Sequence, residues 1–157
     1  MSDINAKSRI HDFLAQQRFA MIGVSRNADD FSRFLLREFL KRNYDVVPVH
    51  PECATMEGRD CAASLAAVAP PVDSVLLMTP PPVTDALVRE FLPAGIKRVW
   101  MYRAVGAGAV SKNAVDFCRA NHIDVVAGEC PMMFLPGAAW FHRLHGLVRT
   151  ITNSYAV

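Results

Sequence analysis

The sequence lacks the patterns of a membrane or secreted protein. No apolar run approaches the ~20 residues that span a bilayer, and the opening stretch MSDINAKSRIHDFLAQQ has no basic-then-apolar signal pattern. We therefore expect a cytoplasmic protein that does not enter a membrane. Clusters of Lys or Arg are also missing, because 17 basic residues are balanced by 15 acidic ones and the formal net charge is only +2. This balance argues against a nucleic-acid partner.

The cysteines are few and lie far apart. Cys53, Cys61, Cys118 and Cys130 form no C-x-x-C pair, so their spacing indicates neither a zinc site nor a disulfide framework. We expect reduced thiols and no metal. What the chain has instead is a composition of 52% hydrophobic and 20% charged residues over 157 positions, which is typical of a globular protein. This length predicts one domain over residues 1–157.

Helical and strand patterns alternate along the chain. The predicted helices are 4–17, 32–42, 64–68, 83–92, 109–120 and 138–151, and the predicted strands are 19–24, 46–49, 74–78, 98–101 and 123–127. Strands that alternate with helices at intervals of roughly 25 residues indicate βαβ units, whose right-handed crossovers give a parallel sheet covered on both faces. The predicted fold is α/β, a doubly wound (Rossmann-like) parallel five-stranded sheet flanked by helices.

The turn after the first strand has residues suited to a phosphate. In an open parallel sheet, a ligand binds outside the carboxyl ends of the strands, where the strand order switches. The turn offers a glycine for a tight bend, two hydroxyl groups, and two cations beside a helix N-terminus. These residues are Gly23, Ser25, Ser32, Arg26 and Arg33. The alternative is a structural turn in which Asp29 and Asp30 cap the helix. The pattern alone leaves both interpretations open.

Two absences count against an NAD(P)-dependent oxidoreductase. Ser25 stands where a G-x-G-x-x-G fingerprint has the second glycine that lets the backbone approach a pyrophosphate. An Asp or Glu that would bind the ribose hydroxyls is also missing, because the second strand ends in His50 and Pro51. His50 is either a surface residue or, given its position, a ligand contact.

Several motifs together resemble the CoA-binding domain family. They are GVS at 23–25, VVPVHP at 46–51, MTPPPV at 78–83, KRVWM at 97–101 and GECPMM at 128–133. The family is the stand-alone domain similar to the N-terminal CoA-binding part of the succinyl-CoA synthetase alpha subunit. The resemblance runs in order over about residues 10–135. It implies a Rossmann-like domain that binds coenzyme A or an acyl-CoA along the strand ends.

The resemblance also assigns roles by position. The pyrophosphate turn would be Gly23, Val24, Ser25 and Arg26, with Ser32 and Arg33 at the helix start. Val49, His50 and Pro51 would flank the adenosine, and Thr79, Pro80 and Pro81 would form the opposite wall. Many members have a W-x-Q-x-G pattern after the fourth strand, whereas this chain has Tyr102 and Arg103 two and three residues after Trp100. Tyr102 and Arg103 are the candidate ligand contacts at this strand end. The loop on the pantetheine side therefore departs from the family.

Catalysis has one candidate residue. Cys130 follows the fifth strand, and His142 and His145 lie in the predicted final helix, so a Cys–His nucleophile is conceivable. No third orienting residue is evident, and an ionised Glu129 beside Cys130 would raise the thiol pKa, which favours an inert or redox-sensitive thiol. We therefore expect a CoA-binding or regulatory module rather than an enzyme. The alternatives are a thioester-handling enzyme, an NAD(P) enzyme, or a domain that docks to a partner or forms a homodimer.

Overall fold

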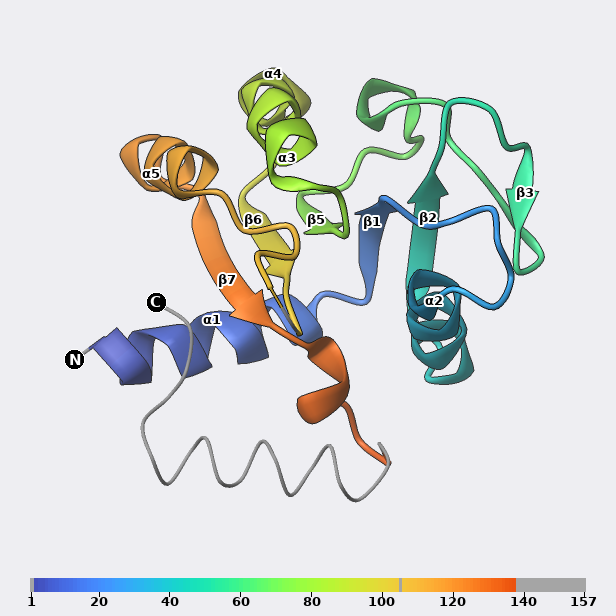
Figure 1. The fold of residues 1–157 in the computed structure, drawn as a ribbon, viewed down its shortest axis with the longest axis horizontal. Coiled ribbons are helices and arrows are strands. Elements are labelled where there is room, and N and C mark those ends of the chain that lie inside the picture. Colours follow the sequence, from blue (N-terminus) through green and yellow to red (C-terminus); the bar gives the residue numbers. More distant parts are fainter. Residues whose placement is uncertain (1, 105, 138–157) are drawn as a thin grey trace.

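A parallel sheet of five strands organises the molecule. The computed structural model describes residues 2–104 and 106–137 of the chain. The strands are β1 (Arg18–Ile22), β2 (Asp45–Val49), β5 (Ser74–Leu77), β6 (Arg98–Tyr102) and β7 (Asp124–Glu129). Their order is β2-β1-β5-β6-β7, so the chain changes direction across the sheet between β1 and β5 (Figure 1). The predicted doubly wound α/β fold is confirmed.

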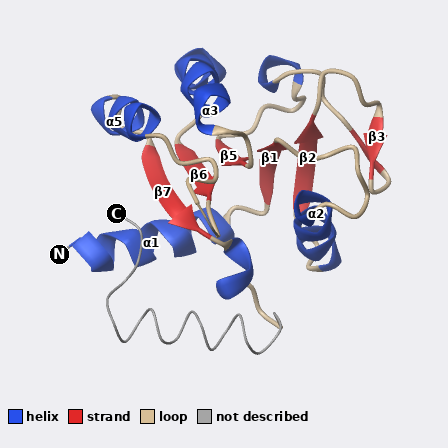
Figure 2. Ribbon diagram, viewed as in Figure 1, coloured by secondary structure: helices blue, strands red, loops and turns tan. Residues whose placement is uncertain are grey.

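Helices cover both faces of this sheet, as Figure 2 shows. One face carries α1 (Ser2–Ala15) and α2 (Phe31–Lys41), and the other carries α3 (Pro81–Leu87), α4 (Phe91–Ala94) and α5 (Lys112–Ala120). Short 3-10 turns occupy Leu65–Ala67, Val88–Glu90 and Pro131–Met133. No helix within the described ranges is long and apolar enough to cross a bilayer.

Alternation along the strands explains the two covered faces. In β1, Phe19 and Met21 belong to the core beneath α1 and α2, whereas Ala20 and Ile22 belong to the core beneath α4 and α5. All four are buried, so the strand reads as a continuous apolar run. On the α1 side Phe19 packs 4.9 Å from Phe39 of α2, centroid to centroid. Burial of each such side chain stabilises the fold by about 1.5–3 kcal/mol.

Several predicted boundaries were wrong at the ends of elements. The helix predicted from residue 83 begins at Pro81, whose fixed backbone angle suits a first turn, and it breaks into a 3-10 turn before α4. The helix predicted from residue 109 begins only after the cap Ser111, whose side chain accepts a hydrogen bond from the Ala114 N–H. The first strand ends at Ile22 and the last extends to Glu129. The predicted helix at 138–151, with His142 and His145, lies outside the described residues.

A hairpin absent from the sequence prediction lies beside β2. It consists of β3 (Thr55–Met56) and β4 (Arg59–Asp60), which pair antiparallel. Its two-residue turn has φ 50° at Glu57 and 75° at Gly58, as expected for the mirror-image turns that match strand twist. After the hairpin, the Ala62 N–H donates to the Pro48 carbonyl, which fastens the segment to the edge of β2. The hairpin turn therefore reaches toward α2.

Gly23 sets the spacing between the ends of β1 and β5. Its φ is 96°, and a Cβ at this position would lie 2.7 Å from the Met78 carbonyl carbon and 2.9 Å from the Thr79 nitrogen. The obstructing atoms are backbone, so no side chain can move aside to make room. The glycine predicted to form a tight turn is therefore required by the neighbouring strand.

Replacing Gly23 with Ala should lower the free energy of unfolding by about 2–4 kcal/mol, because backbone strain and a steric clash add. Gly95 is the matched control, since its φ is 74° but a Cβ there would meet nothing within 4 Å. Gly95→Ala should cost only about 1–2 kcal/mol. Urea denaturation of the two variants measures both values. Equal losses would contradict the role given to the close approach at Met78.

Candidate functional site

A cleft opens at the switch point between β1 and β5. Its volume is about 490 Å³, and it lies at the carboxyl ends of the strands, as parallel sheets require of a ligand site. It is lined by Gly23, Ser25, Asp30, Phe31, Ser32, Met78, Thr79, Pro80, Pro81, Tyr102, Gly108 and Ala109. The structure thus brings together predicted site residues from three separate strand ends.

Asp30 caps the N-terminus of α2. Its carboxylate accepts hydrogen bonds from the Ser32 N–H at 2.8 Å and from the Ser32 hydroxyl at 2.5 Å. These two hydrogen bonds lower the Asp30 pKa below its ordinary value of 3.8, and the bond from the Ser32 hydroxyl contributes more than the bond from the Ser32 N–H. The alternative prediction, that Asp30 caps the helix in a structural turn, is therefore confirmed. An anionic ligand would approach a helix terminus that already faces a carboxylate.

The loop between β1 and α2 is closed by its own hydrogen bonds. The Ser25 N–H donates to the Ser32 hydroxyl at 2.8 Å, and the Asn27 N–H donates to the Ser25 hydroxyl at 3.1 Å. Asn27 in turn accepts from the Asp29 N–H at 3.0 Å through its side-chain oxygen. These bonds fix the loop without a ligand. They also engage the backbone donors of Ser25, Asn27 and Asp29 within the protein.

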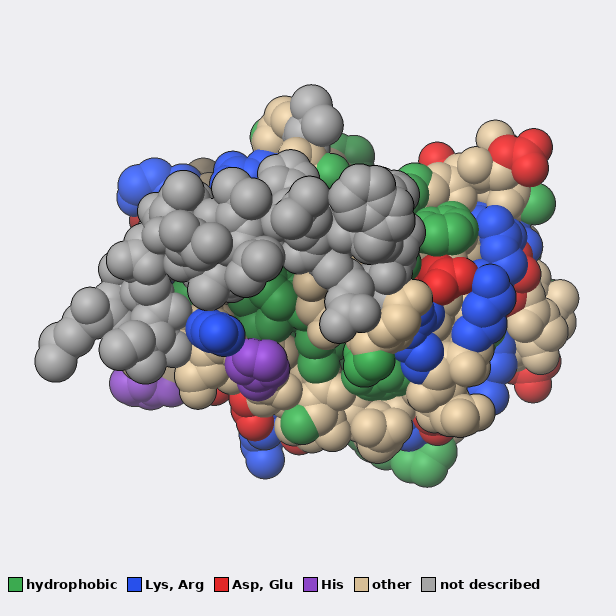
Figure 3. Space-filling view, turned by 90° about the horizontal axis from the view of Figure 1, so that it is seen from below, with side chains coloured by type: hydrophobic (Ala, Val, Ile, Leu, Met, Phe, Trp, Pro, Cys, Tyr) green, Lys and Arg blue, Asp and Glu red, His purple; other side chains and the backbone are tan. Residues whose placement is uncertain are grey.

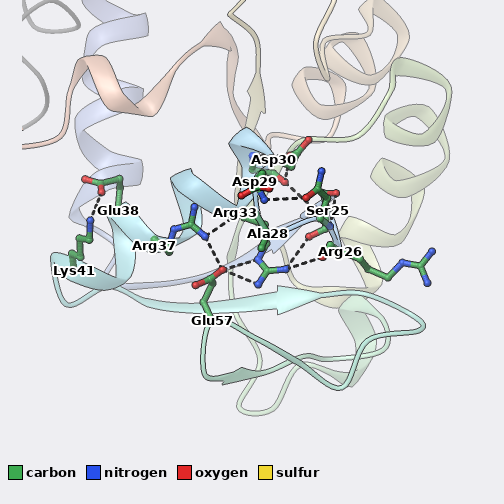
Figure 4. A network of polar contacts seen from close by, with 12 residues as sticks. Ser25, Arg26, Ala28, Asp29, Asp30, Arg33, Arg37, Glu38, Lys41 and Glu57 are labelled. Carbon is green, nitrogen blue, oxygen red and sulfur yellow. Dashed lines mark hydrogen bonds and ion pairs between the residues drawn. The ribbon is translucent and has the colours of Figure 1, made fainter.

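Arg33 is held by Glu57 from the hairpin turn (Figure 4). The Glu57 carboxylate lies 2.7 Å from Arg33 Nη2 and 2.9 Å from Arg37 Nη1, and Arg33 also donates to the carbonyl oxygens of Ser25 and Arg26. Burial raises the Glu57 pKa, but the hydrogen bonds and charges of the two arginines outweigh burial, and the net pKa falls below 4.5. Glu57 thereby joins the hairpin, α2 and the first loop.

Arg26 differs from Arg33 in being accessible. Its side chain is 68% exposed, extends away from Glu57 in Figure 4, and lies 3.5 Å from the equally exposed Glu52. Figure 3, which views the α1 and α2 side of the molecule, shows Lys and Arg side chains mixed with Asp and Glu on the α2 side. Of the two cations predicted in the first turn, Arg26 is thus the one that can turn toward a ligand without breaking a buried contact.

Aromatic rings border the cleft. Tyr102 of β6 lies 5.6 Å from Phe31, centroid to centroid, and Phe31 lies 5.7 Å from Phe34. Burial raises the Tyr102 pKa to about 12, with smaller contributions from Cys130 and Asp30, so its hydroxyl stays protonated at neutral pH. Phe31 and Phe34 remain 37% and 38% exposed. Apolar rings at this edge could contact the carbon skeleton of a ligand.

The opposite wall comes from the segment after β5. Thr79 is buried, and its hydroxyl lies 2.8 Å from that of Thr84 in α3, so this polar group is already paired. Pro80 and Pro81 offer no N–H donor and present apolar ring surface. This side of the cleft therefore suits an apolar or amide-containing chain better than a charged group.

Other predicted site residues do not line the cleft. Val24 and Val49 are buried in the core, and His50 and Pro51 lie at the end of β2, where the His50 Nδ1 accepts from the Glu52 N–H at 3.0 Å. Arg103 lies over the end of β7, since a Cβ at Gly128 would come within 2.6 Å of its guanidinium nitrogen. Arg26 and Arg33 lie in the loop and helix beside the cleft, and they are not among its lining residues either.

Cys130 is not placed as an accessible nucleophile. Its side chain is 3% exposed, and burial raises the thiol pKa to about 11, opposed by a hydrogen bond from the Met132 backbone and aided by Glu129. Such a thiol is almost wholly protonated at neutral pH. Within residues 2–104 and 106–137, no group of three or more His, Cys, Asp or Glu could hold a metal ion.

Sequence reasoning missed Phe31 and Glu57. Phe31 is the first residue of α2 and belongs to the apolar stripe of that helix, so the sequence does not distinguish it from core residues. Its exposed position beside Tyr102 is visible in the structure alone. Glu57 lies 24 positions from Arg33 in a stretch with no helical or strand pattern, so no local signal links the two. The turn pair Glu57-Gly58 is not one of the Asn-Gly or Asp-Gly pairs that indicate a two-residue hairpin, so the turn itself had no clear signal either.

Comparison with known proteins agrees with this architecture. A family model described as a CoA binding domain matches residues 17–136. A hypothetical protein from Pyrococcus horikoshii is 22% identical, with a TM-score of 0.71 over 84% of this chain and 88% of its own. A conserved hypothetical protein from Pyrococcus furiosus is 25% identical, with a TM-score of 0.62 over 71% and 91%, respectively. A Thermus thermophilus protein is 20% identical, with a TM-score of 0.65 over 82% and 91%.

Replacing Glu57 with Gln should reduce the free energy of unfolding at pH 7 by about 1–2 kcal/mol, through loss of its charged hydrogen bonds. Because the folded-state pKa of Glu57 is lowered, its contribution is present above about pH 4.5 and is lost as the pH falls through that lowered value. Urea denaturation across pH should therefore show the two proteins converging in acid. Glu90→Gln, at an exposed position, is the control. A constant difference between wild type and Glu57→Gln at every pH would contradict this assignment.

Proposed function

Because the chain belongs to the CoA-binding domain family, we propose that it is a module that binds coenzyme A or an acyl-CoA in the cleft between β1 and β5. The observation that carries the proposal is the position of the cleft. It lies at the switch point of a doubly wound sheet and gathers Gly23, Ser25 and Pro80, residues that the family resemblance assigned to such a site. We expect the module to act in the cytoplasm.

The residues of the cleft suit different parts of such a ligand. The pantetheine arm is a chain of methylene and amide groups, and the apolar surface of Met78, Pro80 and Pro81 matches it. The diphosphate needs cations, and the exposed Arg26, next in sequence to the lining residue Ser25, is a cation that no buried carboxylate holds. The Asp30 carboxylate faces the cleft and disfavours a phosphate against the α2 terminus. We therefore place the phosphates toward Arg26.

Recognition rather than catalysis fits this arrangement. Nucleophilic attack on a thioester needs a thiolate, and the pKa of about 11 for the buried Cys130 opposes one. Dinucleotide oxidoreduction remains the less favoured alternative, because the loop has only Gly23 and β2 ends without a carboxylate for the ribose. If the protein acted instead by docking to a second copy of the chain or to another protein, the cleft would bind no ligand.

Calorimetric titration of the protein with CoA, acetyl-CoA, NAD and NADP tests the proposal. CoA or acetyl-CoA should bind, and Arg26→Ala should weaken binding about three- to tenfold, the loss expected for one exposed charge–phosphate contact. Arg119→Ala is the matched control, because Arg119 is exposed in the last turn of α5, away from the cleft. Binding of NAD or NADP without CoA, or no binding at all, would overturn the proposal.

Asp30→Asn should change the affinity for CoA in the direction opposite to Arg26→Ala. Asn caps a helix about as well as Asp, so the fold should keep its stability while the cleft loses a negative charge. Affinity for CoA should rise about two- to fivefold, because the cleft no longer carries a carboxylate that repels the phosphates bound toward Arg26. Thermal denaturation verifies the fold, and the same titration measures affinity. A weaker affinity at unchanged stability would mean that Asp30 contacts the ligand as an acceptor.

A further inference from the structure

Two cysteines stand on opposite arms of the hairpin. Cys53 lies two residues before β3, and Cys61 follows β4 directly. The Cys61 N–H donates to the Ala54 carbonyl at 2.9 Å, which continues the antiparallel pairing beyond the strands and draws the two arms together. The side chains of Cys53 and Cys61 pack against the same core cluster, and the Cys53 thiol donates to the Thr55 carbonyl oxygen at 3.4 Å. Their separation in sequence concealed this proximity.

Accessibility separates this pair from the other cysteines. Cys53 and Cys61 are both partly exposed, whereas Cys118 is 0% and Cys130 is 3% exposed. Cys118 is enclosed by the core beneath α5, and burial raises its pKa to about 12. An oxidant in solution therefore reaches the hairpin thiols before the other two.

We propose that Cys53 and Cys61 are a redox modification site, at which a peroxide converts the two thiols into a reversible intramolecular disulfide across the hairpin. This inference does not depend on the ligand of the cleft. Reversible disulfides of this kind occur in proteins of reducing compartments, where permanent structural ones are rare. The bond would close the hairpin at its base, while Glu57 at its tip holds Arg33 and Arg37.

The reaction balances with one peroxide. The Cys53 thiolate attacks a peroxide oxygen, the O–O bond breaks, and Cys53 becomes a sulfenic acid while the released hydroxide takes a proton to form water. Cys61 then loses its proton and attacks the Cys53 sulfur, so that the S–S bond forms, the S–O bond breaks and a second water leaves. Two thiols are oxidised and hydrogen peroxide is reduced to two waters.

The order of the two steps follows from Cys61. Burial and, to a smaller extent, the neighbouring Cys53 raise its pKa to about 11, against the opposing charge of Arg33. Cys61 is therefore a weak first nucleophile, and it acts on the sulfenic acid, which is held beside it. A partner thiol in contact with the sulfenic acid competes effectively with further peroxide, because the step is intramolecular.

Peptide mapping tests the modification directly. The full chain is treated with hydrogen peroxide, its remaining thiols are blocked with N-ethylmaleimide in denaturant, and it is digested with trypsin without reductant. Trypsin cleaves after Arg59, so Cys53 falls in the peptide 43–59 and Cys61 in the peptide 60–89. The expected product is these two peptides joined, at a mass lower than their sum by two hydrogens. A dithiol reductant should separate them.

Variants make the result decisive. Cys53→Ser should remove the linked peptide and leave Cys61 open to alkylation, whereas Cys118→Ser should leave the link unchanged. Amide hydrogen exchange of Ala54 and Cys61 should slow about tenfold or more on oxidation and recover on reduction, a readout that needs no linked peptide. Both hairpin thiols recovered as blocked or singly oxidised peptides, or a link that involves Cys118 or Cys130, would overturn the proposal.

Discussion

The contact between Gly23 and the end of β5 determines the shape of the candidate site. Backbone at Met78 and Thr79 lies so near to Gly23 that no side chain fits between them. The β1–α2 loop is therefore held against the end of β5, and a single cleft is bordered by Ser25 and Ser32, by the prolines at the start of α3 and by Tyr102 of β6. A larger residue at position 23 would push these walls apart. The glycine thus acts here through strand packing, although a dinucleotide fingerprint would assign it to ligand approach.

The polar groups around this cleft are largely engaged by the protein itself. Asp30 occupies the donors of Ser32, and Glu57 holds Arg33 and Arg37. Such pairing preorganises the loop, because the hydrogen bonds exist before any ligand arrives. It also weakens the attraction that a helix N-terminus exerts on an anion. An anionic ligand must therefore gain its binding energy from apolar contacts and exposed cations such as Arg26, more than from the helix terminus.

The fold could be predicted from the sequence because its signal is local. Each buried strand is a short apolar run and each covering helix has an apolar stripe, so β1, β2 and α2 could be found without any long-range information. The hairpin could not, because its strands have two residues each and are fixed by contacts with β2 and α2. For the same reason the site was predicted only in part. Gly23, Ser25 and Tyr102 follow from strand ends, whereas the ion pair of Glu57 depends on tertiary structure.

The candidate site depends on the hairpin, which lies outside the cleft. Glu57 reaches α2 only because a turn with two positive φ values projects it from an edge segment, and that segment is otherwise fastened by few backbone bonds. Short two-stranded hairpins have little stability of their own. Whatever tightens or loosens the base of this hairpin therefore changes how firmly Glu57 holds Arg33, and Arg33 in turn binds the carbonyl oxygens of Ser25 and Arg26. The conformation of the first loop consequently depends on a segment that lies outside the parallel sheet.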